Sequence, residues 1–304
     1  MEMNIAIVYI PHQYQHKEKG FYKSLPKGLN GINYEMFPLE DCCKKIPQNS
    51  LNKFDIISVM GIKKDLDPRT HGIARLMSHY KHKKFLVSEA GYIGNRNKYY
   101  SIGFNGLNGR ADFNNVGMPS ERFDKLNIKL KNTWKPNGNI LFCLQIPSDA
   151  AVNHLQYEDL IQNTIQKILT FSHKNIILRF HPKYNKSKRS HGNLLHDIAC
   201  ELSKHEKINI SNNKSLQDDF KNTSCMVTVN SNSGVDALIS GIPSIVLDEG
   251  SMIWDISCTD LSKVDTIKPV PDNVRLQKLY DIAYAEWNTE EIANGDPFKH
   301  LGII

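Results

Sequence analysis

The sequence of 304 residues lacks the short motifs that would assign a chemistry at once. It has no P-loop, no H-E-x-x-H, no G-x-S-x-G and no G-x-G-x-x-G after an apolar run. Its six cysteines show no C-x-x-C spacing, and its twelve histidines are scattered without a convincing set of metal ligands. We therefore expect no resident metal or cofactor and none of the enzyme classes that these motifs define.

Long apolar runs and leader features are also missing. No run approaches the roughly 18–20 apolar residues that span a bilayer. The opening segment, MEMNIAIVYIPHQ, has neither a basic stretch nor a small-residue cleavage site, and its residues 5–10 are typical of a first strand. We expect a cytoplasmic protein without a membrane span.

Positive charge is unevenly distributed along the chain. The formal net charge is +6, but residues 81–135 carry eleven Lys or Arg against four Asp or Glu, and residues 171–191 carry six Lys or Arg and no acid. Such clustering suits a polyanionic partner or a phosphate-rich ligand. A solvated basic surface is the alternative, and composition alone does not separate the two.

Apolar runs and helix-like stretches alternate in both halves of the sequence. Strands separated by helices predict βαβ units and parallel sheets. With its length, the chain suits two doubly wound α/β domains joined near residues 122–136. We place an N-terminal domain at 1–133, a C-terminal domain at 134–273, and a helical segment that packs back at 274–304. The expected strands are 5–10, 55–60, 84–88, 139–144, 175–180, 208–210, 225–229 and 244–247.

Between these runs, residues 91–118 are rich in Gly, Asn and aromatic residues and show no sustained periodicity. We expect a long loop, and long loops in compact domains are usually functional or disordered. Its aromatic residues argue against disorder. It follows a strand, where an open α/β sheet carries its binding loops.

Polar residues follow three of the expected C-terminal strands. Arg179, His181 and Lys183 alternate after one of them, so in an extended chain they point the same way, which suits a phosphate. Arg179 could instead cap the sheet edge while His181 packs against Pro182. Gln145, at the end of another strand, is a further candidate for ligand binding.

The stretch NSNSG, residues 230–234, opens the next expected helix. Backbone N–H groups at a helix start favour an anion, and Ser and Asn add donors. A helix cap alone would explain the same residues. An acidic pair, Asp248-Glu249, follows the next strand; a carboxylate there can bind a ribose diol, or simply lie in a solvated turn.

Together, His181-Pro182-Lys183, residues 231–234, Gly241-Ile242-Pro243 and Glu249 resemble the donor half of GT-B glycosyltransferases. The likeness is closest to the capsule-polysaccharide and Kdo-transferase-like group and its phage-encoded relatives. The resemblance implies two facing Rossmann-like domains and a metal-independent transfer from a nucleotide sugar, which we expect to be UDP-linked. Combining this resemblance with the positions of the residues, we expect the donor to be bound by Gln145, Arg179, His181, Lys183, Ser231, Asn232, Ser233, Gly234 and Glu249.

Catalytic residues are less visible in the sequence. Arg179 could neutralise the leaving diphosphate. An inverting enzyme also needs a base for the acceptor hydroxyl, and Asp112 and Glu89 are the best placed acids; a retaining mechanism would remove that need. Asp65-Leu66-Asp67 is a D-x-D, the metal motif of another glycosyltransferase fold, but it runs into Pro68, so we interpret Asp67 as a helix cap.

The acceptor is the least determined part. We expect the aromatic loop to bind it through Arg96, Tyr99, Tyr100, Asn105 and Arg110. Because this region combines cations with rings, we predict a hydroxymethylated pyrimidine in phage DNA, modified in the host cytoplasm. A capsule or other cell-surface glycan is the alternative acceptor, and a non-catalytic nucleic-acid-binding protein is the alternative of another class.

Overall fold

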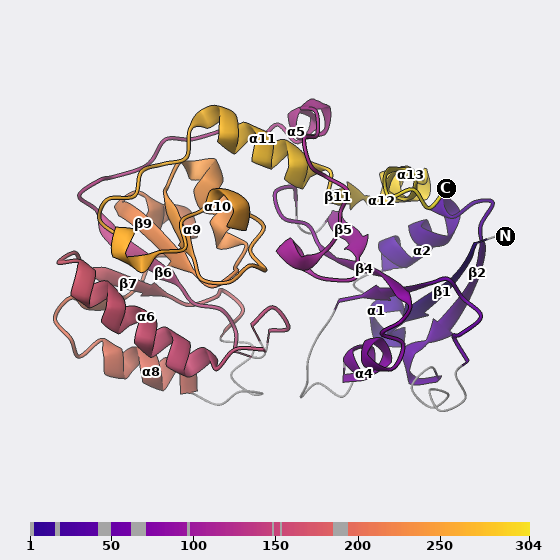
Figure 1. The fold of residues 1–304 in the computed structure, drawn as a ribbon, viewed down its shortest axis with the longest axis horizontal. Coiled ribbons are helices and arrows are strands. Elements are labelled where there is room, and N and C mark those ends of the chain that lie inside the picture. Colours follow the sequence, from indigo (N-terminus) through magenta and orange to yellow (C-terminus); the bar gives the residue numbers. More distant parts are fainter. Residues whose placement is uncertain are drawn as a thin grey trace. The chain divides into compact units, whose positions relative to one another are not determined.

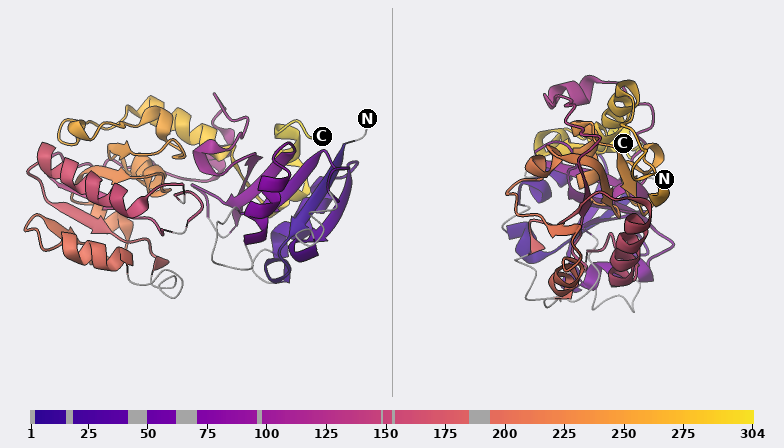
Figure 2. Two further views of the ribbon diagram at one scale, coloured as in Figure 1. Left: turned by 60° about the horizontal axis from the view of Figure 1, so that its bottom comes forward. Right: turned by 90° about the vertical axis from the view of Figure 1, so that its left-hand side faces the viewer.

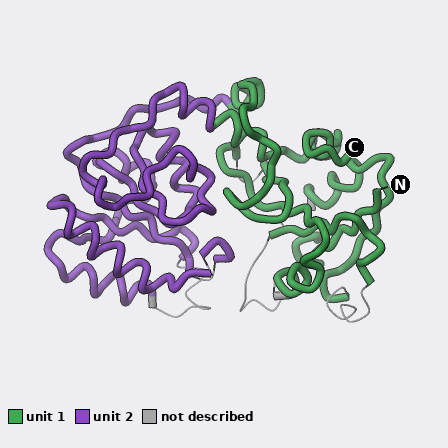
Figure 3. Tube along the Cα trace, in the orientation of Figure 1, with its two compact units in different colours: residues 1–126, 279–304 green, residues 127–278 purple. Residues whose placement is uncertain are grey.

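The chain divides into two compact units, which Figure 3 shows in different colours. The computed structural model describes residues 3–15, 19–41, 50–61, 71–95, 98–147, 149–152, 154–184 and 194–304. Unit 1 comprises residues 1–126 and 279–304, and unit 2 comprises residues 127–278. The sequence suggested a boundary after residue 133 and a separate segment 274–304. In the structure the boundary follows Leu126, and the chain leaves unit 2 within helix α11 (Asp272–Ala283).

Unit 1 is built on a six-stranded sheet in the order β11-β5-β4-β3-β1-β2 (Figure 1). Strands β2, β1, β3 and β4 are parallel, whereas β5 and β11 run antiparallel to their neighbours. Three of the parallel strands are the apolar runs predicted from the sequence. The strands are β1 (Asn4–Tyr9), β2 (Asn33–Pro38), β3 (Ile56–Met60), β4 (Lys84–Ala90), β5 (Tyr99–Phe104) and β11 (Glu286–Asn288).

Helices cover both faces of this sheet. Successive side chains of each strand point to opposite faces, so each strand packs against helices on both sides. Ile5 and Ile7 of β1 pack in a core with α2 (Lys19–Gly28), α12 (Thr289–Ala293) and α13 (Asp296–His300). Ala6 and Val8 pack on the opposite face with α4 (His71–His79). Figure 2 shows these layers from two further sides. The remaining short helices are α1 (Pro11–Gln15), the 3₁₀ helix η2 (Asn108–Arg110) and α5 (Glu121–Lys125).

The expectation of one long loop at residues 91–118 is wrong. This stretch contains β5, which forms a hairpin with β4 and then pairs with β11, followed by η2. The tyrosines at its start belong to the strand, and Tyr100 and Ile102 contribute to the core. An antiparallel strand of mixed Tyr, Ser, Ile and Gly has no long apolar run, which is why the pattern escaped detection.

The C-terminal segment docks on unit 1, but not as one helix. The sequence predicted a helical stretch through Trp287; instead α11 ends at Ala283, and Trp287 lies in β11 with its side chain in the core. Gly28, at the end of α2, makes room for the docking, because a Cβ there would overlap the carbonyl oxygen of Ile292. The absence of a side chain at one position thus lets α12 lie against α2.

A buried carboxylate fixes this segment to the β4–β5 connection. Glu286 of β11 is fully buried and accepts hydrogen bonds from the backbone N–H groups of Tyr92, Ile93 (3.1 Å) and Gly94 (2.6 Å). Burial raises the pKa of Glu286, and the three N–H donors oppose that rise. The short connection is therefore folded around a side chain almost 200 residues away in the sequence.

Replacing Glu286 by alanine is expected to lower the free energy of unfolding by about 2–4 kcal/mol, because buried N–H groups would lose their acceptor. Urea denaturation of the variant beside the wild type measures the change. The matched control is Glu290→Ala, a change at an exposed glutamate two residues into α12. We expect the control to stay within about 0.5 kcal/mol of the wild type. Equal losses in the two variants would contradict this role for Glu286.

Unit 2 carries a five-stranded, fully parallel sheet in the order β10-β9-β6-β7-β8. Its strands are β6 (Asn139–Cys143), β7 (Ile176–Arg179), β8 (Ile208–Ile210), β9 (Thr223–Thr228) and β10 (Ser244–Val246). Its helices are α6 (Tyr157–Phe171), α8 (Leu194–Leu202), α9 (Leu216–Phe220) and α10 (Ser233–Ser240), with 3₁₀ helices at Trp254–Ile256 and Leu261–Lys263. This pattern matches the sequence prediction closely.

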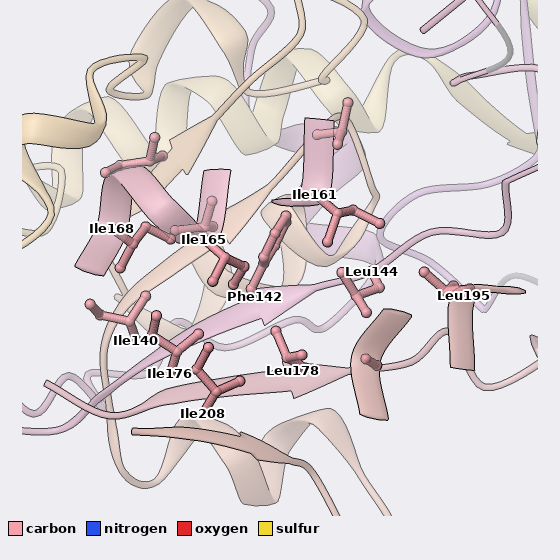
Figure 4. Close-up of a cluster of buried hydrophobic side chains, with 14 of the residues drawn as sticks. Ile140, Phe142, Leu144, Ile161, Ile165, Ile168, Ile176, Leu178, Leu195 and Ile208 are labelled. Carbon is pink, nitrogen blue, oxygen red and sulfur yellow. The ribbon is translucent and has the colours of Figure 1, made fainter. Parts of the chain in front are cut away.

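Both faces of the second sheet are covered as well. Ile140 and Phe142 of β6 pack with side chains of α6 and α8, and Figure 4 shows this cluster. Leu141 and Cys143 lie on the opposite face with side chains of α9 and α10. The prediction of two doubly wound α/β units with a C-terminal segment packing back is thus confirmed. Among the described stretches, no helix combines the length and the apolar character that crossing a bilayer needs.

Candidate functional site

The best candidate for a binding site in unit 2 is the carboxyl edge of its sheet between β6 and β9. The strand order reverses direction there, because connections from β6 lead to β7 and β8 on one side and to β9 and β10 on the other. Open α/β sheets bind ligands outside the carboxyl ends of their strands at such a switch point. The loops after β6, β9 and β10 meet at this edge.

Gln145 and Asn230 join the first two of these loops. The Gln145 side chain donates from Nε2 to Oδ1 of Asn230 (2.8 Å), and the Asn230 backbone N–H donates to Oε1 of Gln145 (3.0 Å). Both residues are buried. The Gln145 N–H also donates to the hydroxyl of buried Tyr157 at 2.6 Å. These two hydrogen bonds join the loops after β6 and β9, and the bond to Tyr157 joins the first of them to α6.

Asp248 extends this network to the loop after β10. Its Oδ1 accepts from Nδ2 of Asn230 (2.6 Å) and from the N–H of Gly250 (2.9 Å), and its Oδ2 lies 2.9 Å from Nε2 of His154. The carboxylate is almost fully buried, whereas the His154 side chain is 42% exposed. Asp248 therefore holds a partly exposed imidazole at the edge of the sheet.

Sequence reasoning missed Asn230, Asp248 and His154 as a group. Asn230 was recognised within the NSNSG stretch, but Glu249 was preferred to Asp248, and His154 was set aside with the scattered histidines. In the structure Glu249 is exposed while Asp248 is buried. The sequence signal was position, since Asn230 and Asp248 each lie two residues after the end of a strand of one parallel sheet.

The start of α10 lies at the same edge. Ser231 Oγ accepts from the N–H of Ser233 (3.2 Å), and the Ser231 carbonyl accepts from the N–H of Gly234 (3.0 Å). The Asn232 side chain does not cap the helix. Ser233 contacts the Cys143 thiol, whose pKa burial raises to about 12. The predicted residues Ser231, Asn232, Ser233 and Gly234 are therefore together, beside the end of β6.

The structure gives Gly234 a packing role. A Cβ at this position would lie 3.0 Å from Cδ1 of Ile253, so the helix start packs closely on the loop after β10. The sequence had placed this glycine among the donor-binding residues. Close packing explains it without a ligand.

Arg179 is not directed as the sequence suggested. Its guanidinium pairs with Asp219 of α9 and also donates to Ser211 Oγ (3.3 Å) and the Asn213 carbonyl (3.2 Å). The Arg179 and Asp219 side chains are 13% and 4% exposed. This arrangement corresponds to the alternative in which Arg179 caps the sheet edge, because its charge is already balanced by a buried carboxylate.

The expected alternation of Arg179, His181 and Lys183 is also wrong. Strand β7 ends at Arg179, and residues 181–184 form a turn in which Tyr184 N–H donates to the His181 carbonyl (2.8 Å). The turn is stabilised by stacking of Tyr184 on Phe180, with centroids 5.0 Å apart. His181 is half-buried and Lys183 is exposed, so these two side chains lie on a turn beside the switch point and not in an extended row.

The two candidate bases lie in different settings within unit 1. Glu89 is half-buried at the carboxyl end of β4, and its Oε2 lies 3.1 Å from where a Cβ of Gly61 would be. Asp112 is exposed, and its Oδ1 accepts from the N–H of Asn114 at 3.1 Å. Asp112 thus stabilises a turn, whereas Glu89 lies at a strand end, where ligands of α/β sheets bind.

Two of the proposed acceptor residues have structural partners. Tyr100 is 8% exposed and packs against Phe21 in the core, with centroids 5.0 Å apart. Asn105 adopts a left-handed conformation (φ 61°), and its Oδ1 accepts from the N–H of Phe85 at 3.0 Å. Tyr100 thus packs in the core, and Asn105 stabilises the end of the β4–β5 hairpin.

Of the other three proposed acceptor residues, the structure describes two. Tyr99 is half-buried and pairs with Asn288 across β5 and β11, and Arg110 is exposed in η2. Arg96 lies outside the described residues, as does the Asp65-Leu66-Asp67 motif. No group of three or more metal-ligating side chains is found in the part of the chain that the structure describes.

Residues 73–260 match the family described as "Capsule polysaccharide biosynthesis protein". The match spans more than half of the chain and includes every strand of unit 2. No curated protein sequence matches the chain.

Solved structures give a second comparison. The β-Kdo 2,4-transferase of Thermosulfurimonas dismutans KpsC is 12% identical, with a TM-score of 0.54, and the similarity covers 95% of this chain and 92% of that one. The β-Kdo 2,7-transferase of the same KpsC is 14% identical with 99% of both chains covered and a TM-score of 0.49. The UDP-GlcNAc 2-epimerase of Methanocaldococcus jannaschii is 15% identical over 100% of both chains, with a TM-score of 0.35. The first of these carries the assignment of fold, and it agrees with the predicted GT-B architecture of two Rossmann-like units.

Proposed function

The chain belongs to the capsule polysaccharide biosynthesis family, and from this membership and its GT-B fold we propose that it is a glycosyltransferase that moves a sugar from a nucleotide donor to a hydroxyl group of a cell-surface polysaccharide. The observation that carries the proposal is the network of Gln145, Asn230 and Asp248 at the switch point of unit 2. Buried side chains hold three loops there, beside the start of an eight-residue helix.

In this proposal the start of α10 binds the donor diphosphate. A helix start favours an anion through its backbone N–H groups. Lys183 and His181, on the turn after β7, supply further positive charge or donors, and His154 adds a third donor side chain. Glu249 is exposed beside Asp248 and is suited to a hydroxyl pair of the donor. Arg179 is left out of the donor set because Asp219 already balances its charge.

For the acceptor, family membership supports a polysaccharide over DNA. The β-Kdo transferases of similar fold also act on sugars, as their names state. Hydroxymethylated DNA, expected from the basic stretch 81–135, has no support from the comparisons. Hydroxymethylated DNA is therefore included as a second acceptor in the experiment below, which also detects binding of nucleic acid without catalysis.

The donor proposal predicts that a suitable nucleotide sugar raises the melting temperature of the protein. A ligand at a hundred times its Kd stabilises the folded state by about 2.7 kcal/mol. The test is a thermal-shift panel of UDP-, GDP- and CMP-linked sugars. Lys183→Ala should weaken the binding of the active donor about 10-fold, through loss of a charge-assisted hydrogen bond.

The control variant is Lys204→Ala, which removes an exposed lysine of unit 2 that forms an ion pair with exposed Glu201. It should bind the donor like the wild type. The active donor is then incubated with capsule-type glycans, hydroxymethylated DNA and plain DNA, and transfer is detected by mass spectrometry. A panel without any thermal shift would refute the donor site, and transfer to DNA alone would overturn the polysaccharide acceptor.

A further inference from the structure

Unit 2 contains a cavity of about 330 Å³ at the end of its sheet opposite the candidate donor site. Its walls come from the segment before β6, from Lys174 just before β7, from Ser224 near the start of β9, and from residues 264–268, which follow the 3₁₀ helix Leu261–Lys263. The cavity therefore lies at the amino edge of the parallel sheet. The five residues of β6 span about 16 Å, and the loops of the donor site follow the other end of the strands. The two sites are separate.

The size and the apolar part of the lining suit a small ring-shaped ligand. Small-molecule sites are concave, have volumes of about 300–1,000 Å³, and combine a mostly apolar lining with a few polar groups. This cavity is at the lower end of that range, which fits a single sugar residue. Trp134 and Ile267, both half-buried, contribute an indole ring and an aliphatic side chain. The C–H groups of a sugar ring carry partial positive charge and pack well on the negative face of an indole.

Hydrogen bonds between different segments hold the walls of the cavity in place. Trp134 Nε1 donates to the Ser224 carbonyl (2.8 Å), which fixes the indole ring against the start of β9. Lys174 Nζ donates to the Pro136 carbonyl (2.8 Å) and lies 3.4 Å from Asp265 Oδ1. The Lys174 and Asp265 side chains are 22% and 36% exposed, so both remain accessible. Because these side chains are already ordered, a ligand would not have to pay the entropy of ordering them.

The charge of the lining favours an acidic ligand. Two lysines, Lys174 and Lys268, line the cavity together with one carboxylate, Asp265. Asp265 balances Lys174, whereas Lys268 is exposed and forms no ion pair with the residues that the structure describes. One positive charge of the lining is thus available to a carboxylate of a ligand, with which an ammonium group forms a charge-assisted hydrogen bond.

The surface beside the cavity offers similar contacts to a longer ligand. Phe171 is 47% exposed and precedes Ser172, whose hydroxyl donates to Asp265 Oδ1 of the cavity wall (2.8 Å). Lys135, which follows Trp134 in the chain, is exposed as well. A further aromatic ring and a further cation therefore flank the cavity, as an acidic chain of several sugar residues would require.

We propose that this cavity is a second carbohydrate site, which binds one acidic sugar residue of the polysaccharide chain away from the place of transfer. The proposal rests on the proposed function and adds a site that keeps the chain on the enzyme. The sugar ring packs on Trp134, its carboxylate pairs with Lys268, and Asp265 and Thr266 bind its hydroxyl groups. A chain held at two sites has a high effective concentration at each, so binding here favours long acidic acceptors.

Binding of short oligogalacturonate chains in the absence of any donor tests the proposal. In a Trp254→Phe background the fluorescence change reports on Trp134, because the remaining Trp287 is buried in unit 1. Neutral cello-oligosaccharides of the same length should bind about 10-fold more weakly than the acidic chains. Lys268→Ala should weaken binding of the acidic chains about 10-fold. The matched control is Lys263→Ala, which removes an exposed lysine of the same loop that does not line the cavity, and it should bind like the wild type.

Trp134→Phe and Trp134→Leu separate ring stacking from the structural role of the indole. Both variants lose the hydrogen bond to the Ser224 carbonyl, but only phenylalanine keeps an aromatic ring. Saturation-transfer NMR should therefore detect the acidic chains on Trp134→Phe and not on Trp134→Leu.

Three outcomes would overturn the second site. Equal Kd values for Lys268→Ala and Lys263→Ala would show attraction by charge alone, and equal binding of neutral and acidic chains would refute the acidic ring. Free galacturonate that binds as tightly as the chains would assign the cavity to a free acidic sugar. Because binding is measured without a donor, a failed donor panel leaves a positive result intact, whereas transfer without chain binding in this cavity would refute the second site alone.

Discussion

Replacing Arg275 by methionine is expected to cost about 3–5 kcal/mol of folding free energy, because the five hydrogen bonds of a buried guanidinium are lost. The Arg275 side chain is 2% exposed, and its pairing partner Asp272 is 63% exposed. Its guanidinium donates five hydrogen bonds of 2.7–2.9 Å within unit 2, to Leu238 O, Ile239 O, Lys131 O, Asn132 Oδ1 and Asp272 Oδ1. Methionine fills a similar space but donates to none of them.

The acceptors show why the loss should be large. Two are carbonyls of the last turn of α10, Leu238 O and Ile239 O, which also accept from the N–H groups of Gly241 (3.2 Å) and Lys131 (2.8 Å). Lys131 and Asn132 belong to the segment that enters unit 2. One buried side chain therefore joins the end of α10, the entering segment and α11. Its loss would remove one hydrogen bond from each of five acceptors at once.

The measurement is urea denaturation of unit 2, followed by a probe such as Trp134 or Trp254 fluorescence. Arg275→Lys keeps the charge but offers three donors in place of a planar fork, so it should lose part of the stability. Lys204→Ala, at an exposed ion pair, should lose less than about 1 kcal/mol. If the urea midpoint of unfolding of Arg275→Met equals that of the wild type, the guanidinium does not hold these elements together.

The regular parts of both sheets could be predicted because burial on two faces imposes continuous apolar runs. The runs at β1, β3 and β4 of unit 1 and all five strands of unit 2 were found in this way. β2, with its exposed and half-buried residues, carries no such run and was missed. The same holds for β5 and β11, whose pairing joins residues nearly 190 positions apart. Local periodicity contains no information on such a pairing.

The details of the candidate site could not be predicted from the sequence. Polar residues after strands of a parallel sheet must gather at one edge, and in the structure Gln145 contacts Asn230 and Ser233 contacts the Cys143 thiol. The sequence cannot tell which charges are already paired. Arg179 was taken as a phosphate ligand because Asp219 lies 40 residues away, and only the fold joins the two. Likewise, Asp248 is buried and Glu249 is exposed, and the sequence does not show which of two adjacent acids is buried.

Asn230→Asp is expected to abolish the donor-induced thermal shift, with a loss of donor affinity of at least about 100-fold. The exchange preserves shape but removes the amide group that donates to Asp248 Oδ1 (2.6 Å) and Ala151 O (2.7 Å). It places a carboxylate against the buried carboxylate of Asp248, whose other oxygen already contacts His154. Repulsion should separate the loops after β9 and β10 and displace the start of α10 from its packing on Ile253.

The same variant should show a characteristic pH dependence of stability. Two carboxyl groups that share a buried site raise the pKa of one of them in the folded state. A carboxyl group with a raised folded-state pKa contributes stability below its unfolded pKa and loses it as the pH rises through the folded value. The stability deficit of Asn230→Asp relative to the wild type should therefore be small near pH 4 and larger near pH 8.

Urea denaturation at both pH values, with the donor thermal shift measured in parallel, separates charge repulsion from a general loss of packing. Asn209→Asp is the matched control, because it makes the same exchange at an exposed position of β8. We expect the control to follow the wild type at both pH values and to keep its response to the donor. A deficit of Asn230→Asp that is equal at both pH values would show that the two carboxyl groups do not interact. An intact donor response in that variant would exclude the β6–β9 edge as the donor site, because the network that holds its loops would then be dispensable for binding.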